Sequence, residues 1–95
     1  MSFLGLYHFT GDSTELLAGY ERLRATYPDP TLDLHVCVVR PDGITVIDTC
    51  PDRETFTSFA AGPDFAVALT GAGLPTPQVE PLGDVYYSVV AGAAR

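Results

Sequence analysis

The chain has no lysine and no tryptophan, and it carries only two cysteines and two histidines among its 95 residues. All five basic residues are arginine, against twelve acidic residues, and the net charge is −7. Phosphate backbones and anionic lipid surfaces repel such a chain, so we expect no nucleic-acid partner and no membrane partner. The N-terminal segment lacks a basic region and has only a short apolar run, which predicts neither a secretory signal nor a membrane span. A cytoplasmic protein with reduced cysteines is therefore expected.

What the chain does contain is apolar and aromatic. Hydrophobic residues make up 46% of the sequence, including five Phe and five Tyr, while only 18% of residues are charged. A length of 95 residues predicts one domain, residues 1–95, with no room for a second core. A domain of this size is only marginally stable alone, so a partner subunit is expected to cover part of its apolar surface.

Helix signals occur in two regions. Asp12 and Glu15 have the spacing of a capping box, and the residues that follow recur at helical intervals as Leu16, Tyr20, Leu23 and Tyr27. Pro51-Asp52 predicts the start of a second helix over 53–60, with Phe56, Phe59 and Ala60 facing inward. Gly62-Pro63 interrupts this helix, and Pro63 favours a restart over 64–73.

Strand signals lie between and around these helices. The segments rich in β-branched and aromatic residues are 3–9, 32–39, 44–50 and 84–90, with a loop over 74–83. The resulting order, β-α-β-β-α-β, is the ferredoxin-like α+β arrangement with an antiparallel sheet and both helices on one face. Because the strands are apolar on both faces, we expect a second copy to cover the bare face, giving a homodimer.

Six residues between positions 43 and 59 match a known pattern: Gly43, Val46, Asp48, Glu54, Phe56 and Phe59. In this pattern and in its element order, the chain resembles the dimeric α/β-barrel superfamily, close to the antibiotic-biosynthesis-monooxygenase-like domains. The resemblance implies a dimeric barrel and cofactor-free oxidation of quinol-like aromatics. Haem-degrading relatives use an Asn, a Trp and a His; this chain has Tyr7 and His8 on the first strand, Cys50 at the Trp position and no His in 52–72. No haem, metal or other cofactor is therefore expected.

The stretch "HVCVVRPDGITVIDTC", residues 35–50, gathers His35, Cys37, Asp48 and Cys50 around a hairpin turn. If Asp42-Gly43 forms a two-residue loop, His35 lies opposite Cys50 and Cys37 opposite Asp48, with all four on one face. Leu34, Val36, Val38 and Ile47 then pack under the helices, and the polar quartet faces the barrel interior. A three-residue loop would separate the two pairs onto opposite faces.

Three interpretations of this quartet compete. Cys, His and carboxylate are zinc ligands, but their spacing follows a flat hairpin instead of the usual C-x-x-C knuckle, which disfavours a metal site. A Cys37–Cys50 disulfide is rejected, because diagonal cross-strand neighbours lie about 7 to 8 Å apart at Cα. The third is a polar lining of a small-molecule cavity, completed by Tyr7 and by Tyr86 or Tyr87.

In the third interpretation His35 acts as a general base oriented by Asp48, and the tyrosine hydroxyls position the ligand. The bland alternatives are a buried histidine satisfied by its neighbours, a strand-end bonding role for Asp48, and core packing for tyrosines such as Tyr20. His8 is expected to pair with Asp12 at the helix cap. The leading hypothesis is a small-molecule-binding protein, such as a cofactor-independent monooxygenase acting on an aromatic or polyketide-like compound. The alternative is a non-catalytic dimerisation or ligand-sensing module, so enzymatic activity stays undecided.

Overall fold

The computed structural model describes residues 2–26, 34–90 and 93–94. Its elements are β1 (Phe3–Thr10), α1 (Ser13–Thr26), β2 (His35–Arg40), β3 (Gly43–Cys50), α2 (Arg53–Ala60), α3 (Pro63–Ala72), β4 (Gln78–Asp84), β5 (Val89–Val90) and β6 (Ala93–Ala94). The first four strands form one antiparallel sheet in the order β2-β3-β1-β4. Each crossover helix thus joins two parallel strands that have an antiparallel strand between them, so the ferredoxin-like α+β prediction is confirmed.

The predicted helix starts are also confirmed. The backbone N–H of Glu15 donates to Asp12 Oδ2 at 3.0 Å, and that of Thr55 donates to Asp52 Oδ1 at 2.8 Å. Pro63 stands in the first turn of α3, and Gly73 ends that helix in the left-handed conformation. Tyr27 lies outside the described residues, so the last position of the predicted α1 stripe is not placed.

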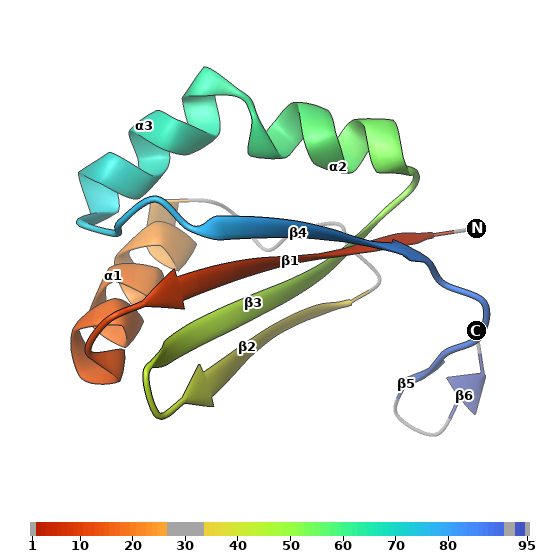
Figure 1. Ribbon diagram of the computed structural model, residues 1–95, viewed down its shortest axis with the longest axis horizontal. Helices are drawn as coiled ribbons and strands as arrows, with labels where there is room; N and C mark the ends of the chain where they lie inside the picture. The colour runs from red at the N-terminus through yellow and green to blue at the C-terminus, as the bar shows by residue number, and fades with distance from the viewer. Residues whose placement is uncertain (1, 27–33, 91–92, 95) are drawn as a thin grey trace.

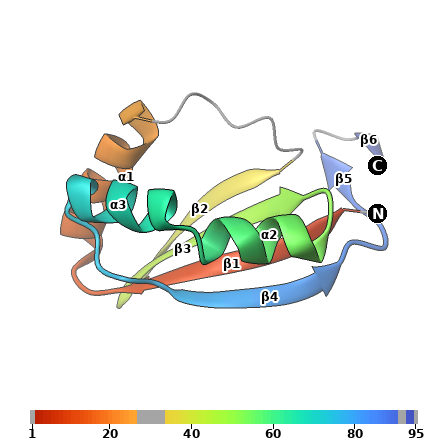
Figure 2. The same cartoon turned by 90° about the horizontal axis from the view of Figure 1, so that it is seen from above.

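The core lies between the sheet and the pair of helices α2 and α3, which cross one face of it (Figures 1 and 2). In the single chain the odd-numbered residues of β1 are buried on this face, and Leu4, Leu6 and His8 are half-buried on the other. Phe56 of α2 is fully buried, and its ring lies 5.7 Å from that of Phe3 and 5.4 Å from that of Tyr7. The helix α1 packs against α3 and β3.

Phe59 differs from its predicted inward position. Its side chain is exposed, although its ring packs 4.8 Å from that of Phe65 at the start of α3. The α2 helix has only eight residues and lies over β1 and β4 through Phe56. At 3.6 residues per turn, three positions along a helix correspond to a rotation of about 300°, so Phe59 is offset by about 60° from Phe56 and lies at the rim of the face that meets the sheet.

The last strand of the sheet is not where the sequence predicted it. The strand β4 spans Gln78–Asp84, so all of it but Asp84 falls in the expected loop 74–83, and the expected strand 84–90 begins at the last residue of β4. Proline cannot donate a ladder hydrogen bond, so Pro81 is an unusual residue within a strand. Because β4 is an edge strand with an irregularity next to Pro81, the missing donor is tolerated there.

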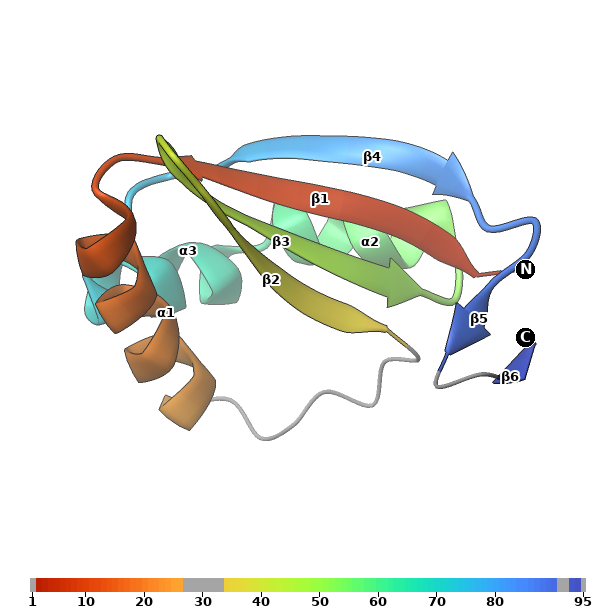
Figure 3. The ribbon, with the colours of Figure 1, turned by 90° about the horizontal axis from the view of Figure 1, so that it is seen from below.

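Beyond β4 the chain leaves the sheet. The N–H of Val85 donates to the carbonyl of Ser2 at 2.7 Å, and the following residues lead to the small β5–β6 pair beyond the end of the sheet (Figure 3). Within the described residues, no helix has the length and apolar character needed to cross a membrane.

A methyl group at Gly5 would disrupt this packing. A Cβ built there lies 2.0 Å from Phe56 Cε1, so Gly5→Ala forces α2 away from β1. We expect a loss of about 1 to 3 kcal/mol in the free energy of unfolding, measured by urea denaturation. The matched change Gly71→Ala meets no atom within 4 Å and sits in a helix, so it should stabilise the protein by about 0.5 to 1 kcal/mol. Equal effects of the two changes would contradict this view of the core.

Candidate functional site

The β2–β3 hairpin brings His35 directly opposite Asp48. Arg40 pairs with Gly43, so the two-residue loop is Pro41-Asp42 and not the predicted Asp42-Gly43. Cys37 consequently lies opposite Val46, and the predicted His35–Cys50 and Cys37–Asp48 pairings are wrong. Each β2 residue therefore pairs with the β3 residue two positions before the predicted one. Because side chains alternate along a strand, a shift of two leaves the same side chains on the same face.

All four residues of the predicted quartet therefore do share one face, but it is the opposite face from the one predicted. Gly5 pairs with Asp48 and Tyr7 with Val46, and these β1 residues face the helices. The quartet thus lies on the helix side of the sheet. Val36, Val38 and Ile47, expected under the helices, lie on the other face instead. Strands that are apolar on both sides carry no pattern that tells the two faces apart.

A hydrogen-bonded chain of three side chains forms at this place. The imidazole of His35 bonds through Nδ1 to Asp48 Oδ1 and through Nε2 to the hydroxyl of Tyr20, 2.6 Å away. The rings of Tyr20 and His35 are nearly parallel, with centroids 6.0 Å apart. Tyr20 belongs to α1, and its expected role in plain core packing is therefore incomplete. The sequence placed Tyr20 on the apolar stripe of α1 that was expected to face the sheet. It could not identify His35 as the partner of Tyr20, because that contact depends on how α1 packs.

The hydrogen-bonded residues are not equally buried. The side chain of Asp48 is 14% exposed and that of His35 is 29% exposed. Burial raises the pKa of Asp48, and the hydrogen bond from His35 partly opposes that rise. Burial also raises the pKa of Tyr7, with further contributions from the negative charges of Asp48 and Cys50. The hydroxyl of Tyr7 therefore stays protonated beside the carboxylate.

The cysteines flank this group without forming a bond to each other. Cys37 and Cys50 are both free and half-buried. Burial raises the pKa of each thiol, and nearby acidic groups raise it further, Glu21 for Cys37 and Asp48 with Asp52 for Cys50. These thiols are poor nucleophiles at neutral pH, since the thiolate is the reactive form.

Not every predicted site residue joins the cluster. Tyr86 follows β4 and is 93% exposed, while Tyr87 is also exposed, so neither lines the surroundings of His35. Within residues 2–26, 34–90 and 93–94, no three His, Cys, Asp or Glu side chains are grouped closely enough to hold a metal ion.

The arrangement can move a proton. A carboxylate only accepts, so Asp48 holds the His35 proton on Nδ1 and leaves a lone pair on Nε2. The Tyr20 hydroxyl donates to that lone pair. An imidazole oriented in this way is a general base for any acidic group that takes the place of the Tyr20 hydroxyl.

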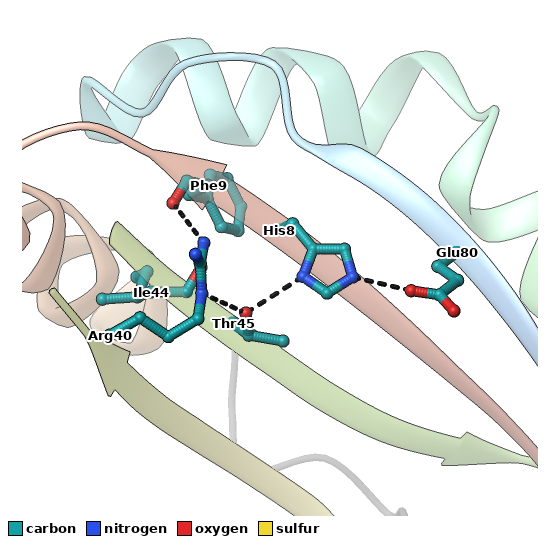
Figure 4. Close-up of polar contacts among 6 residues, drawn as sticks. All are labelled: His8, Phe9, Arg40, Ile44, Thr45 and Glu80. Atoms are coloured by element: carbon teal, nitrogen blue, oxygen red, sulfur yellow. Dashed lines mark hydrogen bonds and ion pairs between the residues drawn. The ribbon is translucent and has the colours of Figure 1, made fainter. Parts of the chain in front are cut away.

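A second polar chain crosses the other face of the sheet, and sequence reasoning missed it (Figure 4). Arg40 Nε donates to Thr45 Oγ1 at 2.8 Å, and Thr45 Oγ1 lies 3.0 Å from His8 Nδ1. His8 Nε2 lies 2.9 Å from Glu80 Oε1. Because the Glu80 carboxylate accepts, the proton of a neutral His8 sits on Nε2 and Thr45 donates to Nδ1. The predicted His8–Asp12 pairing is wrong, since β1 places His8 opposite Thr45.

Comparison of the chain with models of known protein families gives no match. Comparison with curated proteins and with solved structures likewise gives none. The resemblance to antibiotic-biosynthesis-monooxygenase-like domains thus stays a prediction.

The buried carboxyl of Asp48 should leave a signature in the pH dependence of stability. Its pKa is raised in the folded protein from an ordinary value of 3.8, so it stabilises the fold below that pH, and this contribution is lost as pH rises through the folded pKa. We expect the free energy of unfolding of the wild type, minus that of Asp48→Asn, to fall between pH 3 and pH 7. Urea denaturation at several pH values measures it.

The matched control is Asp64→Asn, which removes an exposed carboxylate in the first turn of α3. If Asp48→Asn shows a difference that stays level or grows with pH, burial does not govern this carboxyl.

Proposed function

We propose that this protein is a homodimeric small-molecule-binding protein in which His35 acts as a general base. The observation that carries the proposal is the Asp48–His35 pair, whose second ring nitrogen already bonds to a hydroxyl. Such a pair needs a ligand with a weakly acidic O–H or C–H group. Tyr7 is buried, and the charge of Asp48 contributes to the raised pKa of its hydroxyl, so we assign Tyr7 a positioning role on the buried side of the site.

The ferredoxin-like fold and the His35–Asp48 pair favour an aromatic or polyketide-like ligand and a cofactor-independent, monooxygenase-like reaction. In that reaction His35 removes a proton from a ring CH₂ group, and the resulting anion is oxidised by dioxygen. One oxygen atom enters the product as a carbonyl and the other leaves as water, so a CH₂ group and O₂ become C=O and H₂O. The proposal places the protein in the dimeric α/β-barrel superfamily and in the cytoplasm, where Cys37 and Cys50 stay reduced.

The proposed dimer forms across the sheet face that α2 and α3 leave bare (Figure 3). The register puts Leu4, Leu6, Val36, Val38 and Ile47 on this face. Val36 and Val38 are 37% and 39% exposed in the single chain. In the proposed dimer this patch of one copy contacts the same patch of the other copy, as in any isologous interface.

A dimerisation or ligand-sensing module without catalysis is the second candidate. The same bare face favours this candidate. So does the Tyr20 hydroxyl, because it bonds to His35 Nε2, the nitrogen that would act as the base. In that case His35 would be a satisfied structural histidine.

Proton abstraction can be tested without the natural substrate. We expect the protein to speed deuterium uptake from D₂O at the acidic C–H of aromatic ketones and 1,3-diketones, followed by NMR. Loss of the base in His35→Ala should lower this rate by about 10²- to 10⁴-fold. Removing the competing hydroxyl in Tyr20→Phe should raise it.

The control Asp64→Asn should exchange at the wild-type rate, and sedimentation should show His35→Ala to have the same oligomeric state as the wild type. Equal rates for wild type and His35→Ala across the panel would reject the catalytic function and favour the module.

The dimer face has its own test. Val38→Glu places two like charges against each other across the interface, which costs several kcal/mol, so we expect the dissociation constant to rise about a hundredfold or more. Sedimentation equilibrium measures it. Val67→Glu is the matched control, because Val67 is 70% exposed on α3, on the opposite side of the sheet. A monomeric wild type, or equal effects of the two variants, would refute the proposed face.

A further inference from the structure

The two halves of α1 are held in place in different ways. The first half is anchored in the core, because the buried residues of the helix are Leu16 and Gly19. From residue 20 to residue 26 every side chain is half-buried or exposed, and the half-buried ones are Tyr20 and Leu23. Figures 2 and 3 show these last turns running past α3 on the side of β2. Apolar burial therefore holds the second half of α1 less firmly than the first.

Two polar contacts fasten this second half. The hydroxyl of Tyr20 donates to His35 Nε2, 2.6 Å away. Arg22 Nε donates to the carbonyl oxygen of Ala72 at 2.8 Å. Ala72 is the last residue of α3, where a carbonyl has no partner within its own helix and where the helix dipole favours a cation. Arg22 thus ties the turn of α1 that carries Tyr20 to the end of α3.

A weak point in α1 lies directly before this half. A Cβ built at Gly19 would lie 2.8 Å from Leu74 Cδ2, so the close approach of the segment after α3 requires glycine at this position. Glycine is also, apart from proline, the residue that holds a helix least well, because its backbone loses the most entropy on ordering. Residues 20–26 can therefore open locally from Gly19 while Leu16 stays anchored in the core.

We propose that residues 20–26 form a gate over the base, which Tyr20 closes and Arg22 holds shut. In the closed state the Tyr20 hydroxyl covers the lone pair of His35 Nε2. In the open state this half of α1 moves away from Gly19 onward, and the lone pair is free. The inference rests on the proposed function, since it adds how access to the proposed base is controlled. Arg22 is a positioning residue, because it acts on His35 through Tyr20.

The protonation of Tyr20 fits a closing role. Burial raises the pKa of the Tyr20 hydroxyl, with a further contribution from Cys37. Tyr20 therefore keeps its proton at neutral pH and does not become a base in place of His35. A neutral imidazole has one nitrogen lone pair, and the phenol hydroxyl already bonds to it. A ligand can give a proton to His35 only after Tyr20 has moved.

The gate can be tested by labelling the histidines with diethyl pyrocarbonate, which acylates the free lone pair of a neutral imidazole. Labelling at about pH 8 keeps an ordinary imidazole neutral. Peptide mass spectrometry reports the rates at His35 and His8 separately, and His8 is the internal standard. We expect Tyr20→Ala to raise the rate at His35 about tenfold or more and Arg22→Ala to raise it about threefold or more, with the rate at His8 unchanged.

Arg24→Ala is the matched control for Arg22→Ala. Arg24 belongs to the same half of α1, and it forms an ion pair with Glu21 of the same helix. Its removal should leave both histidines at the wild-type rate. The double variant Tyr20→Ala with Arg22→Ala should label His35 no faster than Tyr20→Ala alone, because a gate without its closing side chain has nothing left for Arg22 to hold.

Equal labelling of His35 in the wild type and in Tyr20→Ala would overturn the gate, and so would an Arg22→Ala variant that labels like Arg24→Ala. If Arg22→Ala raised the rate as much in the Tyr20→Ala background, or raised it at His8 as well, Arg22 would support the whole fold, which overturns its positioning role. None of these rates depends on turnover. A gated His35 without deuterium exchange would reject the proposed catalysis alone, and exchange that needs an ungated His35 would keep the catalysis and reject the gate.

Discussion

The contact between Phe56 and Gly5 determines which face of the sheet the helices cover. The ring of Phe56 lies so close over β1 that no side chain fits at position 5, and the rings of Phe3 and Tyr7 pack beside it. Side chains alternate along a strand, and directly opposed residues share a face. Once the odd-numbered residues of β1 face the helices, the orientation of every residue in β3 and β2 follows from the register.

This alternation explains why the two histidines serve separate polar chains. The strand β3 supplies a partner to each: Thr45 to His8 and Asp48 to His35. Thr45 and Asp48 are three positions apart, an odd number, so they point to opposite faces. The helix-side chain can reach Tyr20 of α1, whereas the chain on the bare face joins Arg40 and Glu80 from the two edge strands.

The sequence predicted the parts of the fold that depend on local chemistry. Caps at Asp12 and Asp52, the helix restart at Pro63 and the element order all follow from residues within a few positions of each other. One local prediction failed, since the hairpin loop is Pro41-Asp42 and not Asp42-Gly43, and the other failed parts depend on tertiary placement. Pro81 is tolerated because β4 is an edge strand. The face of the sheet on which His35 lies depends on which side of β1 the ring of Phe56 packs. The shared face of His35 and Asp48 survived the wrong register because an even shift preserves it.

The same geometry separates the proposed catalytic site from the proposed interface. His35 and Asp48 lie on the helix side of the sheet, while Val38 lies on the other side. A substitution on the bare face therefore changes association without touching the Asp48–His35–Tyr20 chain. Conversely, the alternation that keeps His35 off the bare face places Val36 and Val38 there, with Arg40 at the end of the same strand. Val36 and Val38 are the exposed, uncharged part of the face on which the proposed dimer would bring two chains of net charge −7 together with least repulsion.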